Sequence, residues 1–156
     1  MKAQPDMKNT YIVFEIAGTS YAVHSRSVQQ IEMVEHITPL PNAPESIDGV
    51  VFTRGQVIPA LNLRARFGFE RVSPTNRTRL IVVNTGDRMV ALIVDTAREF
   101  MTISETAITP PAESLAHISG RYLKGTVTID DRIILVINLE EVIGVSQALE
   151  EISGKK

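Results

Sequence analysis

The 156-residue chain has no cysteine and no tryptophan, and only eight of its residues are aromatic. The absence of cysteine excludes disulfides and thiolate metal sites, and it is typical of a protein from a reducing compartment. The three histidines, His24, His36 and His117, lie far apart, and none has another metal-binding side chain at ligand spacing. We therefore expect neither a bound metal nor any other cofactor.

The chain also lacks the sequence signatures of the common enzyme classes. It has no G-x-S-x-G elbow, no phosphate-binding glycine loop and no dinucleotide fingerprint. Its acidic pairs, Asp130-Asp131 and Glu140-Glu141, fall in a predicted hairpin turn and on an exposed helical turn, where solvated carboxylates are common. We predict that the protein is not an enzyme and has no catalytic residue.

Charge and hydrophobicity indicate a soluble globular protein. The 16 basic and 18 acidic residues give a formal net charge of −2, so no strong field attracts nucleic acid or anionic lipid. The longest wholly apolar run is Ile133–Ile137, which is too short to span a bilayer. Residues 1–9 are polar and contain no apolar core of a secretory signal. We expect no direct contact with a membrane.

A stretch of twenty residues occurs twice. Gly49–Gly68 reads as a strand, a tight turn, a second strand and a short helical turn, and Gly125–Gly144 has the same layout. The two turns differ, because Arg54-Gly55 in the first copy is replaced by Asp130-Asp131 in the second. Six of the twenty positions are identical at a fixed offset of 76: Gly49/Gly125, Val51/Val127, Ile58/Ile134, Asn62/Asn138, Leu63/Leu139 and Gly68/Gly144.

The repeat extends to the whole plan of the chain and predicts the fold class. Each half contains about five short strands separated by glycine and proline, and five short strands close best as a small barrel without exposed edges. Because about 65 residues bury little core alone, we expect two tandem five-stranded SH3-like barrels packed on a shared core, with short helical turns and a C-terminal helix. The predicted boundaries are a flexible tail over 1–10, one domain over 11–145 with barrels at about 11–70 and 78–143, and a C-terminal helix and tail over 145–156.

Three local features complete the prediction. A short helical turn is expected within Ser25–Gln30, capped by Ser25 or Ser27, with Val28 and Ile31 facing inward. Phe100–Ile108 is predicted to be extended. The second half is about eight residues longer than the first, and we expect the extra residues within 112–124.

Eight short motifs stand out along the chain: Val28–Ile31 (VQQI), Leu40–Pro44 (LPNAP), Ile47–Val50 (IDGV), Arg54–Pro59 (RGQVIP), Leu61–Arg64 (LNLR), Leu92–Asp95 (LIVD), Ile108–Pro111 (ITPP) and Ile134–Leu139 (ILVINL). In their order and spacing they resemble the CheW-like coupling proteins of bacterial chemosensory systems. The resemblance covers Tyr11 to about Ile143. It implies a cytoplasmic adaptor that joins the helical-hairpin tips of methyl-accepting chemoreceptors to the regulatory domain of a CheA-type histidine kinase, is recruited to membrane-associated receptor arrays, and is a monomer when free.

The resemblance also implies two contact surfaces. The receptor tip would lie in a groove between the barrels, and the kinase would contact the first barrel. A second kinase contact on the other barrel would allow rings of alternating adaptor and kinase domains. The implied receptor-binding positions are Val28, Gln30, Ile31, Arg54, Leu80 and Phe100, and the implied kinase-binding positions are Ile37, Thr38, Asp48 and Gly49.

Two departures from the family pattern keep alternatives open. The family usually has Glu where this chain has Gln30, and that carboxylate would pair with the arginine at Arg54. The family also favours Asn-Leu where this chain has Phe52-Thr53. An accessory protein that binds only one of the two partners is therefore a second hypothesis. A small-barrel nucleic-acid binder that uses the arginines between residues 64 and 88 is a third, although the chain has few aromatics for base stacking.

Overall fold

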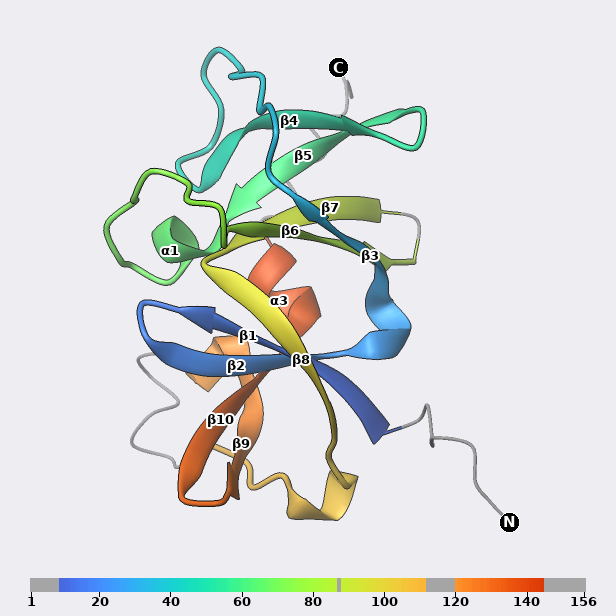
Figure 1. The fold of residues 1–156 in the computed structure, drawn as a ribbon, viewed down its shortest axis with the longest axis vertical. Coiled ribbons are helices and arrows are strands. Elements are labelled where there is room, and N and C mark those ends of the chain that lie inside the picture. The colour runs from blue at the N-terminus through green and yellow to red at the C-terminus, as the bar shows by residue number, and fades with distance from the viewer. Residues whose placement is uncertain (1–8, 87, 112–119, 145–156) are drawn as a thin grey trace.

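The structure, a computed structural model, describes residues 9–86, 88–111 and 120–144 (Figure 1). Strands dominate it, and its few helices are short. The strands are β1 (Thr10–Ile16), β2 (Thr19–His24), β3 (Val28–Met33), β4 (Ile47–Thr53), β5 (Gln56–Asn62), β6 (Arg79–Thr85), β7 (Arg88–Val94), β8 (Thr96–Thr102), β9 (Leu123–Ile129) and β10 (Arg132–Ile137). The helices are α1 (Leu63–Arg66), α3 (Leu139–Ile143) and the 3-10 turns η2 (Ser25–Ser27), η3 (Glu105–Ala107) and η4 (Gly120–Tyr122).

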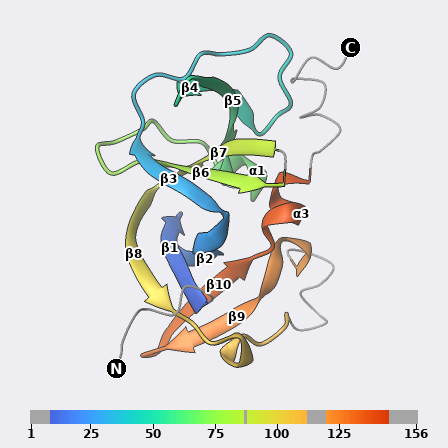
Figure 2. The same cartoon turned by 90° about the vertical axis from the view of Figure 1, so that its right-hand side faces the viewer.

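The strands form two five-stranded sheets that lie one above the other along the long axis of the molecule (Figures 1 and 2). Sheet A has the order β8-β1-β2-β10-β9, and sheet B has the order β3-β6-β7-β5-β4. The mostly β architecture with two five-stranded units is thus confirmed.

Each sheet takes strands from both halves of the chain, which differs from the predicted division at about 11–70 and 78–143. The hairpin β1–β2 pairs with strands of the second half, and β6–β7 pairs with strands of the first. Parallel ladders between β2 and β10 and between β5 and β7, and antiparallel ladders between β1 and β8 and between β3 and β6, make these joins. The halves have therefore exchanged their first hairpins. A repeat in the sequence shows that two hairpins are alike, but not which copy pairs with which strands.

Neither sheet closes into a barrel through a continuous ladder, in contrast to the predicted closed barrels. The chain beyond β3 instead returns to β4 through one bridge, in which Thr38 and Val50 exchange two backbone hydrogen bonds of 2.9 and 2.8 Å. Thr109 and Thr126 do the same in sheet A, with two bonds of 2.8 Å. Within the described residues, each sheet is thus closed by a single bridge.

The closing bridges explain the repeated glycines. A Cβ atom on Gly49 would lie 2.1 Å from the carbonyl oxygen of Thr38, and one on Gly125 would lie 2.3 Å from that of Thr109. Such distances are far inside van der Waals contact, so only glycine allows the returning chain to approach the strand. The same close approach of the returning chain in both sheets therefore explains why both positions are glycine.

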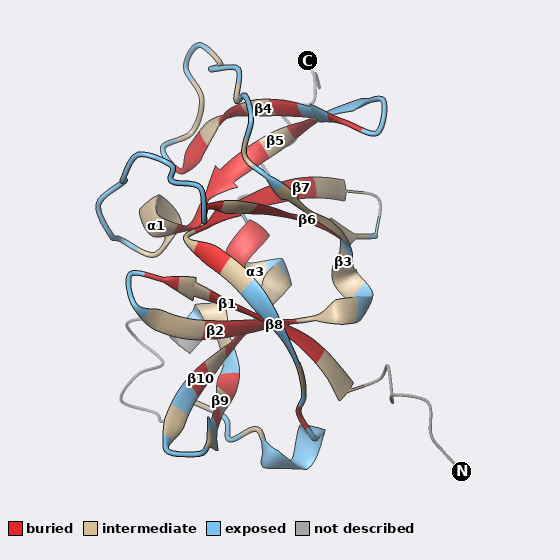
Figure 3. Ribbon diagram, in the orientation of Figure 1, coloured by how far each residue is buried: buried red, intermediate tan, exposed pale blue. Residues whose placement is uncertain are grey.

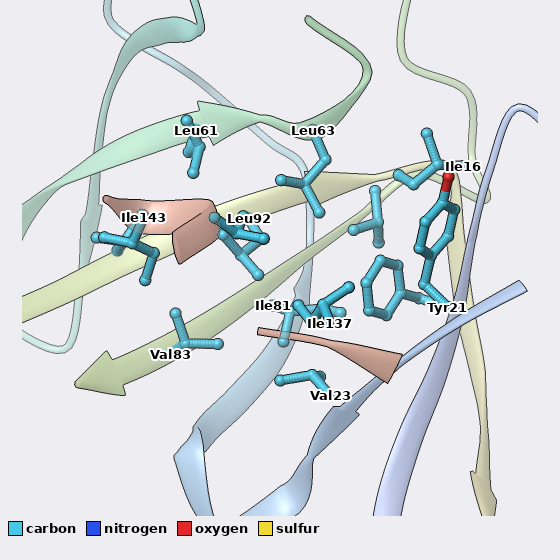
Figure 4. Close-up of a cluster of buried hydrophobic side chains, with 14 of the residues drawn as sticks. Ile16, Tyr21, Val23, Leu61, Leu63, Ile81, Val83, Leu92, Ile137 and Ile143 are labelled. Carbon is cyan, nitrogen blue, oxygen red and sulfur yellow. The ribbon is translucent and has the colours of Figure 1, made fainter. Parts of the chain in front are cut away.

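A central apolar cluster holds the two sheets together, as the shared core predicted from the sequence requires. Strands of the exchanged hairpins are buried on both faces (Figure 3). On β1, Phe14 and Ile16 face the central cluster, whereas Tyr11 and Val13 face the interior of sheet A. Strands from both sheets, together with α1 and α3, supply the cluster's labelled members in Figure 4: Ile16, Tyr21, Val23, Leu61, Leu63, Ile81, Val83, Leu92, Ile137 and Ile143.

Some local predictions need correction. The helical turn predicted within 25–30 is only the 3-10 turn η2, and its cap is His24, whose Nδ1 accepts a hydrogen bond from the Arg26 amide at 3.1 Å. The extension predicted over 100–108 is interrupted by η3, because the Ser104 hydroxyl caps that turn. Val28 and Ile31 do pack inward, against the central cluster. The predicted C-terminal helix over 145–152 and most of the extra segment lie outside the described residues.

Replacing Gly125 with alanine tests the closing bridge. Gly125→Ala is expected to lower the free energy of unfolding by about 2 to 3 kcal/mol, because the new methyl group forces the Thr109 carbonyl away from the strand. Denaturant unfolding followed by circular dichroism measures the change. Lys124→Ala, at the exposed neighbouring position, is the control and should change stability by less than about 0.5 kcal/mol. Equal stability of Gly125→Ala and the parent protein would contradict this explanation of the repeat.

Candidate partner-binding site

The β4–β5 hairpin presents Arg54 at its tip. Arg54 and Gly55 have φ values of +53° and +79°, as a type I′ turn requires at its two central residues. A left-handed backbone costs a non-glycine residue about 1 to 2 kcal/mol. Its guanidinium is exposed and has no hydrogen bond or ion pair within the described ranges. The side chain is therefore available to a partner.

A polar clasp, which we define as Gln30, Glu32 and Thr53, joins the two end strands of sheet B. The Gln30 side-chain amide donates to the Thr53 hydroxyl at 3.0 Å, and that hydroxyl donates to the Glu32 carboxylate at 2.5 Å. Thr53 is only 6% exposed, so its hydroxyl needs these partners. Gln30 and Thr53, two of the three residues at which the chain departs from the family pattern, thus bond to each other.

Sheet A has no counterpart of the clasp. The repeat places Ile129 at the position equivalent to Thr53, and Ile129 packs with Met101 against the interior of sheet A. Glu32 was not among the residues predicted from the sequence. A glutamate on an end strand, with a threonine at the end of another, gives no sequence signal until the topology brings the two strands together.

The other predicted receptor-binding residues are spread over both sheets. Val28 and Ile31 on β3 are partly buried against the central cluster, and Leu80 is 3% exposed inside sheet B. Phe100 is 67% exposed and lies on β8, which belongs to sheet A. The strands β3 and β8 are equivalent end strands of the two sheets, so the predicted set would require a partner that reaches both.

A hollow of about 470 Å³ lies between the two sheets, and it is lined by residues other than the predicted receptor-binding ones. Residues from β1, β2 and β10 line it on the side of sheet A, and Asn84, Thr85 and Gly86 line it on the side of sheet B. None of the ten predicted contact residues is in its lining. The residues implied by the resemblance therefore lie outside this hollow.

The predicted kinase-binding residues, in contrast, come together at the closing bridge of sheet B. Thr38 bonds to the backbone next to Gly49, and Ile37 packs against the interior of the same sheet. The Asp48 carboxylate accepts hydrogen bonds from Arg71 Nε at 2.8 Å and from Asn62 Nδ2 at 2.9 Å. Both oxygens of Asp48 are thus engaged within the protein.

The bonds of Asp48 reveal two residues whose role was missed by sequence reasoning. Arg71 also donates to the carbonyl oxygen of Glu45 and so fastens the loop after α1 to β4. Asn62 uses its side-chain oxygen to cap α1, accepting from the Ala65 amide at 3.1 Å, and Asn138 caps α3 in the same way. The repeated asparagines are therefore helix caps, and in the first copy the cap also positions Asp48.

Arg64 and Asp95, which end two of the family-like motifs, form one ion pair. The shortest contact, Arg64 Nη2 to Asp95 Oδ2, is 2.7 Å, and Arg64 Nε lies 2.9 Å from Asp95 Oδ1. The amide of Ala17, in the β1–β2 turn, donates to the same carboxylate at 2.8 Å. Because Ala17 belongs to sheet A and Arg64 to α1 after sheet B, the ion pair links the two sheets.

The environment of Asp95 lowers the pKa of its carboxyl group. Partial burial acts to raise this pKa, but the hydrogen bonds from Arg64 and Ala17 and the charge of the guanidinium together outweigh it. The hydrogen bond to Asp95 correspondingly raises the pKa of Arg64. The pair is therefore ionised at neutral pH.

Within the described ranges, no three His, Asp or Glu side chains lie close enough together to hold a metal ion. None of the described helices has the length and the apolar composition that a membrane-spanning segment needs.

Asp95→Asn is expected to lower the free energy of unfolding by about 1 to 2 kcal/mol at pH 7. The folded-state pKa lies below the unfolded value of about 3.9, so the advantage of the parent protein is complete well above that value and is lost as pH falls through the folded-state pKa. Urea titrations at a series of pH values measure this difference. Arg64→Met should cause a similar loss, and the double variant should lose little more. A difference that persists unchanged to pH 2 would argue against the ion pair.

Thr53→Val tests the polar clasp, because valine keeps the shape of threonine and removes its hydroxyl. We expect a loss of about 1 to 2 kcal/mol, since Gln30 and Glu32 both lose a partner in a half-buried setting. Thr53→Ser retains the hydroxyl and should cost less. Thermal unfolding of the three proteins provides the comparison, and a Thr53→Val protein as stable as the parent would show that the clasp contributes nothing.

Comparisons with known proteins give the family. A family model described as CheW-like domain matches residues 10–147. A probable chemotaxis protein CheW from Rhizobium etli is 32% identical over 129 residues, which cover 83% of each chain. Protein FrzA from Myxococcus xanthus is 33% identical over 114 residues, covering 71% of this chain and 69% of its own.

A solved structure agrees with the sequence comparisons. The crystal structure of the scaffolding protein TtCheW from Thermoanaerobacter tengcongensis matches with a TM-score of 0.79 at 30% sequence identity, covering 86% of this chain and 92% of that chain. Sequence and architecture thus agree over almost all of the described residues. The chain belongs to the CheW-like domain family.

Proposed function

We propose that the protein is a non-enzymatic adaptor that couples the cytoplasmic tips of chemoreceptors to a CheA-type histidine kinase. The observation that carries this proposal is the extent of the family match, because residues 10–147 contain both sheets and their shared core. The protein would act as a scaffold through binding alone, in the cytoplasm, recruited to receptor arrays, and as a monomer when free.

The kinase contact is placed on the closing bridge of sheet B, at Ile37, Thr38, Asp48 and Gly49. Two features support this placement. The four residues are contiguous in space, and the bonds of Asp48 to Arg71 and Asn62 tie this surface to the loop after α1 and to the cap of α1. A preorganised surface loses less conformational entropy when a folded domain binds to it.

The receptor contact is placed around Arg54, with Gln30, Val28 and Ile31 on β3. Arg54 is exposed at a tight turn, and Gln30 is bonded to the residue that precedes Arg54. Leu80 supports this surface from inside sheet B, where it pairs with Glu32 on β3. Phe100, on β8 of sheet A, would form the far end of the receptor contact.

A second candidate is an accessory adaptor that binds only one of the two partners. The polar clasp favours it, because Gln30 and Thr53 bond to each other on the receptor side and leave the predicted kinase surface unchanged. In this case the kinase domain would bind and the receptor would not.

Two titrations by calorimetry distinguish the candidates. One adds the regulatory domain of the cognate kinase to the full chain, and the other adds a cytoplasmic fragment of the receptor. For a coupling adaptor both partners should bind. Arg54→Ala should weaken only the affinity for the receptor fragment, by about tenfold, which corresponds to about 1.4 kcal/mol.

The control for Arg54→Ala is Asp130→Ala, at the equivalent turn position of the β9–β10 hairpin. It should leave both affinities within about twofold. If the parent protein binds the kinase domain and not the receptor fragment, it is the accessory adaptor and not the coupling adaptor. Binding of neither partner would refute both.

A further inference from the structure

The repeat relates two junctions between the sheets. Ala22 pairs with Val136 as Ala91 pairs with Ala60, so β1–β3 correspond to β6–β8 at an offset of 69 residues. The β4–β5 hairpin and α1 correspond to the β9–β10 hairpin and α3 at an offset of 76. Three pairs of positions therefore correspond at the two junctions: Arg64 and Glu140, Asp95 and Arg26, and Glu15 and Asn84.

The first junction is closed by the Arg64–Asp95 ion pair. The amide of Ala17 donates to the same carboxylate, so the β1–β2 turn, α1 and the end of β7 meet there. The hollow that remains beside the pair has a volume of about 260 Å³, and the loop after α1 lines one side of it with Val72 and Ser73. The charges of Arg64 and Asp95 are thus satisfied within the protein.

The second junction has the two charges in reversed order, and they do not pair. Glu140 stands where the first junction has Arg64, and Arg26 stands where it has Asp95. Neither side chain forms a hydrogen bond or an ion pair within the described ranges. The hollow of about 470 Å³ lies at this junction, and Glu140 is in its lining. The second junction is therefore open where the first is closed.

Unsatisfied polar atoms gather at the open junction. Among the described residues, the two buried side-chain oxygens without a hydrogen-bond partner are Asn84 Oδ1 and Ser25 Oγ. Asn84 lines the hollow, and Ser25 lies in the chain between His24 and Ser27, which also line it. No side-chain hydrogen bond holds the Asn84 amide, so rotation about χ2 can turn its oxygen into the hollow. Asn84 can therefore accept a hydrogen bond from a ligand.

The rim of the hollow carries one charge of each sign above an apolar floor. Lys124 on β9 and Glu140 on α3 are exposed, and neither has an ion pair within the described part of the chain. The volume falls in the range of about 300 to 1,000 Å³ that is typical of small-molecule sites. The floor is formed by the aliphatic side chains of Val23, Val136, Ile137 and Leu139.

We propose that the open junction binds a small zwitterion of the amino-acid class with an apolar side chain. The ammonium group of the ligand pairs with Glu140 and donates to Asn84, and its carboxylate pairs with Lys124. The apolar side chain covers the aliphatic floor. This site is independent of the proposed coupling function, since none of the ten predicted contact residues lines the hollow.

The test titrates the full chain with each of the twenty common L-amino acids and follows the backbone amides by NMR. At least one aliphatic or aromatic amino acid should bind saturably, with a Kd of about 1 mM or lower. The amides that shift should include those of residues 84–86 and 138–140, which line the hollow. Aspartate and glutamate, which lack an apolar side chain, should bind at least about tenfold more weakly.

Two charge variants test the recognition of each end of the ligand. Glu140→Gln and Lys124→Met should each weaken binding by about tenfold. The N-acetyl derivative of the ligand lacks the ammonium charge and should bind the parent about tenfold more weakly, but Glu140→Gln should weaken it little further. The methyl ester should behave in the same way with Lys124→Met. Asp131→Asn removes an exposed carboxylate outside the lining and should change affinity by less than about twofold.

Asn84→Leu separates ligand binding from a structural role. Because the Asn84 side chain makes no hydrogen bond within the described residues, this variant should melt at a temperature no lower than the parent while its affinity for the ligand falls. A lower melting temperature with unchanged affinity would make Asn84 a structural residue and overturn its place in the site.

Two results would overturn the whole inference. One is the absence of saturable shifts with every amino acid up to about 20 mM, since any affinity would then be weaker than the site should provide. The other is saturable binding that Glu140→Gln, Lys124→Met and Asn84→Leu all leave unchanged, which would place the ligand elsewhere. Neither result would affect the titrations with the kinase domain and the receptor fragment, which contain no amino acid.

Discussion

The exchange of hairpins between the two halves determines most of the structure, because it places β1, β2, β6 and β7 between two apolar layers. Each of these strands contributes one face to the central cluster and the other to the interior of its own sheet. A hairpin buried on both faces cannot leave without exposing two cores, so the two sheets form one unit. The Arg64–Asp95 ion pair and its bond to Ala17 reinforce the same junction at its edge.

The sequence predicted the content of the fold better than its connectivity. Strands, turns and the shared core follow from glycine and proline spacing and from apolar runs, which are local signals. The exchange of hairpins and the incomplete closure do not follow from these local signals. Two similar hairpins could each pair with the strands of either half, and the sequence does not specify which. The repeated Gly49 and Asn62 were visible as identities, but their reasons, a carbonyl contact and a helix cap, required the structure.

The candidate site, too, could be predicted from the sequence only in part. The exposed turn at Arg54 was predictable, since a two-residue hairpin loop projects its central side chains. The meeting of Gln30, Glu32 and Thr53 was not, because these residues lie on end strands of sheet B and come from separate segments. Gln30 and Thr53, which looked like independent departures from the family pattern, belong to one hydrogen-bonded unit. The polar groups of this clasp bond to one another, whereas Arg54 has no hydrogen bond or ion pair within the described ranges.

The proposed coupling role requires one molecule of this protein to hold two different partners at once. Sedimentation velocity of the full chain with the kinase regulatory domain and the receptor fragment, singly and together, tests it most directly. Because the residues proposed for the receptor contact differ from those proposed for the kinase contact, the coupling role predicts a ternary complex larger than either binary complex, with neither partner displacing the other. Mutually exclusive binding, in which the receptor fragment releases the kinase domain, would contradict it.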